Sequence, residues 1–168
     1  MTDLDRLSRE TFVAAVGGIF EHSPWVAEAV ADLRPFGAID TLHAAMVAAV
    51  MGATPERQLA LLQAHPELAG KLARAGGLTA ASAGEQASLG LDRLDDAQIA
   101  RFDRANERYR ARFGFPFIIA VKAQRDRRAI LDAIETRAGN ERAVEIETAL
   151  AEVAKIARFR LEALAEAA

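Results

Sequence analysis

The sequence predicts an all-α fold contained in a single domain, residues 1–168. Apolar residues recur three or four positions apart along most of the chain, which is the spacing of a buried helix face. Ser, Thr, Asp or Pro precede several of these runs and Gly often follows them, as expected at helix starts and ends. One stretch, residues 113–121, has strand-like composition, but no partner strand appears elsewhere to satisfy its backbone.

Composition excludes several classes of protein. The chain is 51% hydrophobic and 27% charged, as in soluble globular proteins. Its net charge of −3 and pI of about 5.7 argue against a nucleic-acid partner. The absence of cysteine excludes disulfides, a thiol nucleophile and zinc-thiolate sites. No apolar run reaches the ~20 residues that span a bilayer, and the N-terminus is unlike a signal peptide. We therefore expect a cytoplasmic protein with no membrane partner.

The first two helices are predicted from a cap and a proline. Ser8 is expected to cap a helix whose apolar positions run through residues 12–20. Ser23 and Pro24 start a second, short helix. We predict that its apolar face contains Trp25, Ala29, Val30 and Leu33.

The third and fourth helices are bounded by equally local signals. Asp40 or Thr41 is predicted to cap the third, which Gly52 ends. Pro55 opens the fourth, which runs into a break at His65.

His65 is the histidine with the most suggestive position. Because proline is favoured at the first helical position, we predict a helix over residues 66–73 with His65 at its cap. The N–H groups of that helix start would attract an anion and keep the imidazole neutral near pH 7. Such a group suits proton transfer on a carboxylate substrate, but a purely capping histidine fits the same pattern. His22 and His43 are expected to be structural.

A second polar motif follows in the middle of the chain. Ser82 and Glu85 have the spacing of a capping box, in which each closes the helix start for the other. On that interpretation Gln86 is solvated.

The second half is predicted to contain three more helices. A capped turn over residues 92–96 leads into a helix over 97–112, and further helices cover 129–138 and 141–168. Between them, residues 113–121 are expected to start extended and continue as a short buried helix or coil. That stretch either places bare backbone groups in a pocket or simply fills the core. In the last helix, Arg158 and Arg160 flank the buried stripe and are expected to face solvent or form salt bridges. That stripe is predicted to comprise Ala143, Ile146, Leu150, Val153, Ala154, Ile156, Ala157, Leu161 and Leu164.

Four motifs in register resemble the OHCU decarboxylase family, OHCU being 2-oxo-4-hydroxy-4-carboxy-5-ureidoimidazoline. The resemblance covers nearly the whole chain. The motifs are His65-Pro66-Glu67-Leu68-Ala69-Gly70-Lys71, Ser82-x-x-Glu85-Gln86, Phe113-Gly114-Phe115-Pro116-Phe117-Ile118 and Ile156-Ala157-Arg158-Phe159-Arg160-Leu161.

The resemblance implies a fold, an activity and a site. It implies a multi-helix bundle of this family's type, often dimeric, that converts OHCU to (S)-allantoin with no cofactor or metal. The histidine of the first motif is catalytic in the family, which maps to His65. Arg158 is the alternative to Arg160, because the register of the last motif is less constrained. The implied substrate-binding residues are Pro66, Ser82, Glu85, Gln86, Ile118, Ile119, Ala120 and Arg160.

Two other functions stay open at this point. One is a non-catalytic helical domain that binds a ligand or acts as an adaptor. The other is a decarboxylase or lyase acting on a related ureido or imidazolinone acid. The intact set of His65, Glu85 and Arg160 favours an enzyme over a binding domain. A urate oxidase or hydroxyisourate hydrolase among the genome neighbours would separate OHCU from a related substrate.

Overall fold

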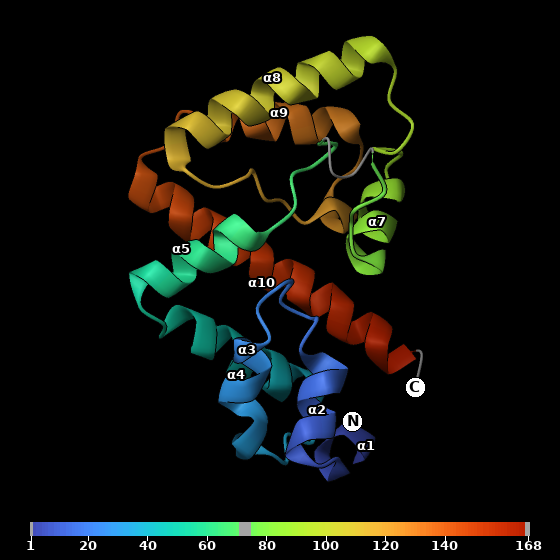
Figure 1. Cartoon of the computed structure of the whole chain (residues 1–168), viewed down its shortest axis with the longest axis vertical. Coiled ribbons are helices and arrows are strands. Elements are labelled where there is room, and N and C mark those ends of the chain that lie inside the picture. The colour runs from blue at the N-terminus through green and yellow to red at the C-terminus, as the bar shows by residue number, and fades with distance from the viewer. Residues whose placement is uncertain (1, 71–74, 167–168) are drawn as a thin grey trace. The chain divides into compact units, whose positions relative to one another are not determined.

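The computed structural model describes residues 2–70 and 75–166, and all regular elements among them are helices (Figure 1). This confirms the all-α prediction. The chain divides into two compact units: residues before His65 together with those after Val153, and His65–Val153. None of the described helices is long and apolar enough to cross a membrane.

The first unit is built from short helices, of which α3 and α4 pack together. Ser8 caps α2 by accepting the Thr11 N–H, and Gly52 ends α4, both as predicted. The predicted cap of α4 is wrong, because the helix begins at Ile39, before Asp40. The elements are α1 (Thr2–Arg6), α2 (Arg9–Val16), α3 (Trp25–Val30), the 3₁₀ turn η1 (Ala31–Leu33), α4 (Ile39–Met51) and α5 (Pro55–Ala64).

The buried face of α3 differs from the predicted one. The helix buries Val26, Ala27 and Val30, and it packs against α2 and α4. Leu33 is instead 61% exposed. The helix is only six residues long and passes into η1, whose tighter winding shifts the later side chains off the face set by α3.

The second unit surrounds a buried extended segment. Asp95 and Gln98 form a capping box that starts α8, and Gly114 ends it in the left-handed conformation, with φ of 81°. Residues 115–120 are then buried and non-helical, which agrees with the predicted extended start and favours coil over a short helix for the rest of this stretch. The elements are α7 (Ala80–Ala87), α8 (Asp96–Phe113), the 3₁₀ turn η2 (Val121–Ala123), α9 (Arg127–Arg137) and the first part of α10 (Arg142–Glu166).

Aromatic rings hold the extended segment against α8. Tyr109 lies edge-on to Phe115 and Phe117, with ring centroids 6.0 and 5.2 Å apart. Both phenylalanines are fully buried. Because alternate residues of an extended chain share a side, these two rings reach the same tyrosine and fix how residues 118–120 lie.

Helix α10 contributes residues to both units, and its buried stripe is largely as predicted. Ile146, Ala154 and Leu164 are only half-buried, and Ala143 is exposed, so the stripe begins later than expected. Three charged residues missing from the prediction lie in the buried stripe: Glu145, Glu152 and Arg160.

Candidate functional site

The chain after α5 does not form the predicted helix over residues 66–70, and Lys71–Ala73 lie outside the described residues. Residues 66–70, hereafter the 66–70 loop, instead turn at Ala69, whose φ is 51°. The Ala69 N–H donates to the Gln86 Oε1 atom at 2.9 Å. A backbone group that is bonded across the fold in this way is not available to a helix, so tertiary contacts override the proline signal.

This correction changes the surroundings of His65. His65 directly follows the last residue of α5 and is half-buried. A helix C-terminus carries partial negative charge, the reverse of the expected positive end. The argument for an anion site and a neutral imidazole at a helix start therefore does not apply to residues 65–70.

Two amide side chains hold the backbone of the 66–70 loop, and Arg110 Nη2 pairs with the Glu67 carboxylate of this loop at 3.3 Å. Gln86 accepts from Ala69 and also donates from Nε2 to the Glu67 carbonyl at 3.4 Å. Asn106 of α8 donates from Nδ2 to the Leu68 carbonyl at 2.8 Å. The structure thus brings the His-Pro motif and the Ser-x-x-Glu-Gln motif together through Gln86.

The predicted capping box at Ser82 and Glu85 is wrong. Thr79 is the cap of α7, and its side chain accepts the Ser82 N–H. Ser82 therefore lies within the first turn, where it shares the buried face of α7 with Gln86 four residues later. Gln86 is buried rather than solvated, and Glu85 is half-buried.

Residues 118–120, hereafter the 118–120 segment, precede η2, which packs against α7. The Ile118 carbonyl accepts from Arg137 Nη1 at 2.8 Å, and the Ala120 N–H donates to Glu152 Oε2 at 2.8 Å. The Ala120 carbonyl accepts from the Ala123 N–H at 3.0 Å. Several backbone groups of the residues that the resemblance assigns to the substrate are therefore bonded within the protein.

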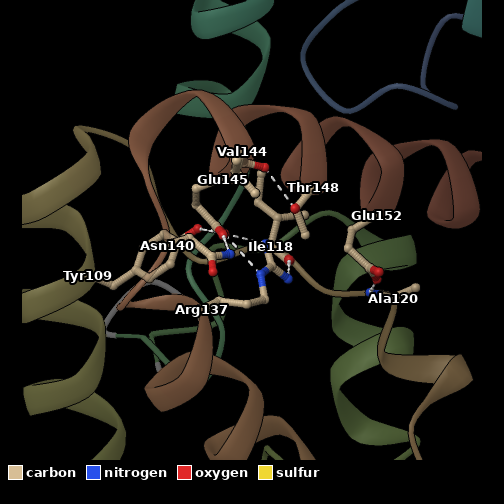
Figure 2. A network of polar contacts seen from close by, with 9 residues as sticks. All are labelled: Tyr109, Ile118, Ala120, Arg137, Asn140, Val144, Glu145, Thr148 and Glu152. Atoms are coloured by element: carbon tan, nitrogen blue, oxygen red, sulfur yellow. Dashed lines mark hydrogen bonds and ion pairs between the residues drawn. The ribbon is translucent and has the colours of Figure 1, made fainter.

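A fully buried carboxylate, Glu145, organises the neighbouring core (Figure 2). It accepts from Arg137 Nε and Nη2 at 2.9 and 2.6 Å, from Asn140 Nδ2 at 2.7 Å, and from the Tyr109 hydroxyl. Burial, together with the bond to Glu145, raises the pKa of Tyr109, so the phenol stays protonated and donates.

The sequence analysis did not identify the two buried acids of α10, Glu145 and Glu152. Their signal is their register, because Glu145, Ala149, Glu152 and Ile156 follow helical spacing and all four are buried.

Arg160 belongs to the first unit and is also buried. Its Nη2 pairs with Glu21 Oε2 at 3.0 Å, and its Nη1 donates to the Ile19 carbonyl at 3.4 Å. Arg158 instead pairs with Asp40 and Glu162 at a partly exposed position. Both arginines form salt bridges, as expected, but only Arg158 reaches solvent. Glu21, buried beside Arg160, is a further residue that the sequence did not indicate.

Comparison with known proteins gives matches over nearly the whole chain. The family model described as OHCU decarboxylase matches residues 5–162. A 2-oxo-4-hydroxy-4-carboxy-5-ureidoimidazoline decarboxylase from Haloferax volcanii is 47% identical over 161 residues, which are 96% of this chain and 93% of that protein.

Two solved structures are similar to this fold. The crystal structure of an (S)-allantoin synthase is 32% identical, with a TM-score of 0.75, and the match covers 97% of this chain and 53% of that chain. The crystal structure of an OHCU decarboxylase in the presence of (S)-allantoin has a TM-score of 0.70 at 20% identity, covering 94% of this chain and 98% of that one. On the family match and the 47% identity, this chain belongs to the OHCU decarboxylase family, whose members are decarboxylating lyases.

Proposed function

We propose that this protein decarboxylates OHCU to (S)-allantoin, the last step from urate, without a cofactor. The observation that carries the proposal is the family match over residues 5–162, within which every motif residue of the expected site is present. These residues are His65, Pro66, Ser82, Glu85, Gln86, Ile118, Ile119, Ala120 and Arg160.

The reaction needs little from the protein beyond positioning and one proton. Cleavage of the C–C bond releases CO₂ and leaves an electron pair on the former carboxylate-bearing carbon. The adjacent C=N of the ring takes up that charge, and protonation on one face sets the S configuration. The protein must hold the carboxylate perpendicular to the ring, exclude water and direct the proton.

His65 is the residue that we propose to hydrogen-bond the substrate's carboxylate. It stands at the end of α5, half-buried, at the start of a loop that is fixed by Gln86 and Asn106. A hydrogen bond from the imidazole to the carboxylate or the 4-hydroxyl would tilt the carboxylate out of the ring plane.

The remaining residues bind the rest of the substrate. We assign Arg160 to an anionic or ureido oxygen because a guanidinium carries five N–H donors, although its Nη1 and Nη2 already contact the Ile19 carbonyl and Glu21. Glu85 and Ser82 are suited to the ureido and ring amide groups. Gln86 already uses both ends of its amide on the 66–70 loop, so we assign it first to holding that loop beside the substrate.

We further propose that the chain works as one domain, as a homodimer and in the cytoplasm. Family resemblance supports the dimer, and the lack of a membrane-spanning helix in the described part of the chain is compatible with the location. Light scattering on the purified protein measures the assembly. A monomeric mass would contradict the dimer and leave the reaction assignment intact.

Circular dichroism tests the reaction. OHCU is generated freshly from urate with a urate oxidase and a hydroxyisourate hydrolase, and the protein is then added. We expect rapid appearance of the (S)-allantoin signal, at a rate that extensive dialysis against EDTA does not lower. A signal no faster than spontaneous decay would refute the decarboxylase, and a rate restored only by added metal would refute the cofactor-free reaction.

A further inference from the structure

The 118–120 segment is held at both ends by charged side chains, one half-buried and one buried (Figure 2). Arg137 of α9 donates to the Ile118 carbonyl, and Glu152 of α10 accepts the Ala120 N–H, each at 2.8 Å. Only 12% of the Arg137 side chain is exposed, and Glu152 is buried. Hydrogen bonds to ionised groups are shorter and stronger than neutral ones, so these two contacts hold the backbone tightly.

The Arg137 guanidinium is itself fixed in orientation. Its Nε and Nη2 contact Glu145, which leaves Nη1 directed at the Ile118 carbonyl. Tyr109 and Asn140 donate to the same carboxylate from two other parts of the unit. Because the guanidinium is planar and rigid, fixing two of its nitrogens fixes the third.

Ile119 lies between these two anchored neighbours. Within the part of the chain that the structure describes, neither its backbone N–H nor its carbonyl forms a hydrogen bond. The residue is nevertheless buried, with only 6% of its surface exposed. Buried backbone groups are nearly always bonded in native proteins, so this peptide donor and acceptor are suited to a ligand.

We propose that Arg137 and Glu152 are positioning residues, which fix Ile118 and Ala120 so that the Ile119 backbone groups meet the substrate in one orientation. The inference rests on the proposed decarboxylation and adds residues outside the family motifs to it. Glu145 belongs to the same arrangement because it orients Arg137.

Two conservative substitutions test this role. Arg137→Lys keeps a positive charge opposite Glu145, but one ammonium group cannot reproduce the fork that reaches Glu145 and the Ile118 carbonyl together. Glu152→Gln keeps the size and an acceptor oxygen but removes the charge. For both we expect kcat/KM with OHCU to fall about 10- to 100-fold, the range for losing a well-placed hydrogen bond to a charged group.

Matched substitutions on the same helices serve as controls. Arg128→Lys changes an exposed arginine of α9, and Glu147→Gln changes an exposed glutamate of α10. Both controls should keep the wild-type kcat/KM. All rates are measured well below each variant's melting temperature, so that loss of folded protein does not contribute.

The readout that separates positioning from stability is binding. Misplaced Ile119 groups weaken the enzyme–substrate complex, so most of the loss should appear as a higher KM. The Kd for (S)-allantoin, measured by titration calorimetry, should rise about 10-fold or more in parallel. Stability loss alone would leave KM and this Kd unchanged in the folded fraction.

Amide exchange followed by NMR tests the anchors without turnover. In the wild type the Ala120 N–H should exchange slowly, and Glu152→Gln should accelerate that exchange at least about tenfold. Unaltered exchange would overturn Glu152 as an anchor.

Failure of this inference differs from failure of the proposed function. Wild-type turnover of OHCU with normal KM and Kd in both variants would overturn the positioning role alone. A wild type that produces no (S)-allantoin would overturn the proposed function, and this role with it.

Discussion

Two non-helical stretches of the second unit are held by different chemistry. The backbone of the 66–70 loop is held by neutral amides, those of Gln86 and Asn106. The Glu67 side chain of this loop also forms a partly exposed ion pair with Arg110, Oε1 to Nη2 at 3.3 Å. The 118–120 segment is held by ionised side chains, those of Arg137 and Glu152. Both stretches carry residues of the expected site, yet the side chains that anchor their backbones differ in charge.

This difference affects how completely each anchor must be satisfied. A neutral amide can be left partly unsatisfied: Asn106 Oδ1 is buried and, among the described residues, lacks a hydrogen-bond partner. A buried charged group needs its partners more, because leaving it uncompensated costs far more free energy of folding than leaving an amide oxygen without a hydrogen bond. Glu145 accordingly collects donors from Tyr109, Arg137 and Asn140. The two stretches should therefore respond unequally to loss of an anchor.

The largest loss of stability is expected from Arg137→Ala. This substitution leaves the fully buried Glu145 without its cation, which costs about 3–5 kcal/mol in the free energy of unfolding. Denaturant unfolding of the variant measures it. Arg128→Ala removes an exposed arginine whose Nε lies 3.9 Å from Asp132 Oδ2. This variant should lose about 0.5 kcal/mol or less in the free energy of unfolding. Similar values for the two variants would contradict the cost assigned to an uncompensated buried charge.

A smaller loss is expected from Gln86→Leu. The Ala69 N–H then lies buried without its acceptor, at a cost of about 1–3 kcal/mol. Ala87→Leu, at the next and exposed position of α7, controls for adding leucine to this helix. A loss equal to that of Arg137→Ala would show that charge does not set the order.

The smallest effect is expected at a half-buried anchor near the N-terminus, Asp5. Its carboxylate accepts the N–H groups of Phe36 and Gly37 at 2.9 and 3.0 Å. The Phe36 bond is the main cause that holds the pKa of Asp5 below its ordinary value of 3.8. A lowered pKa stabilises the fold above the unfolded-state pKa, and that contribution is lost as pH falls through the folded-state value.

We therefore expect Asp5→Asn to cost a few tenths of a kcal/mol near pH 7, because solvent screens this carboxylate. The difference from wild type should shrink below about pH 4. Urea unfolding at several pH values measures it, and a difference that grows on acidification would contradict the assigned contacts.

Local signals predicted much of the fold. Ser8 and Gly52 act within one turn of their own positions, so the sequence around each suffices. The absence of a β-strand at residues 115–120 was also predictable, because this lone apolar stretch after Gly114 has no strand to pair with, but the sequence left coil and a short helix open for its later part.

Contacts between distant residues account for what the sequence did not predict. A proline permits a helix at Pro66 but does not require one, and Gln86 and Asn106 decide the outcome. The capping-box spacing at Ser82 fails because Thr79 caps the helix three residues earlier. Glu145 would be assigned to solvent by its charge alone, since its partner on α9 is eight residues away.

Turnover by His65→Asn measures most directly whether His65 carries the decarboxylation. Asparagine keeps a polar side chain but is shorter than histidine and cannot place its donor where the imidazole would bond the carboxylate or the 4-hydroxyl. We therefore expect kcat/KM for (S)-allantoin formation to fall about 10²–10³-fold. Because His65 is half-buried beside a helix end, the melting temperature should stay close to that of the wild type. A folded variant with wild-type kcat/KM would show that His65 is not catalytic.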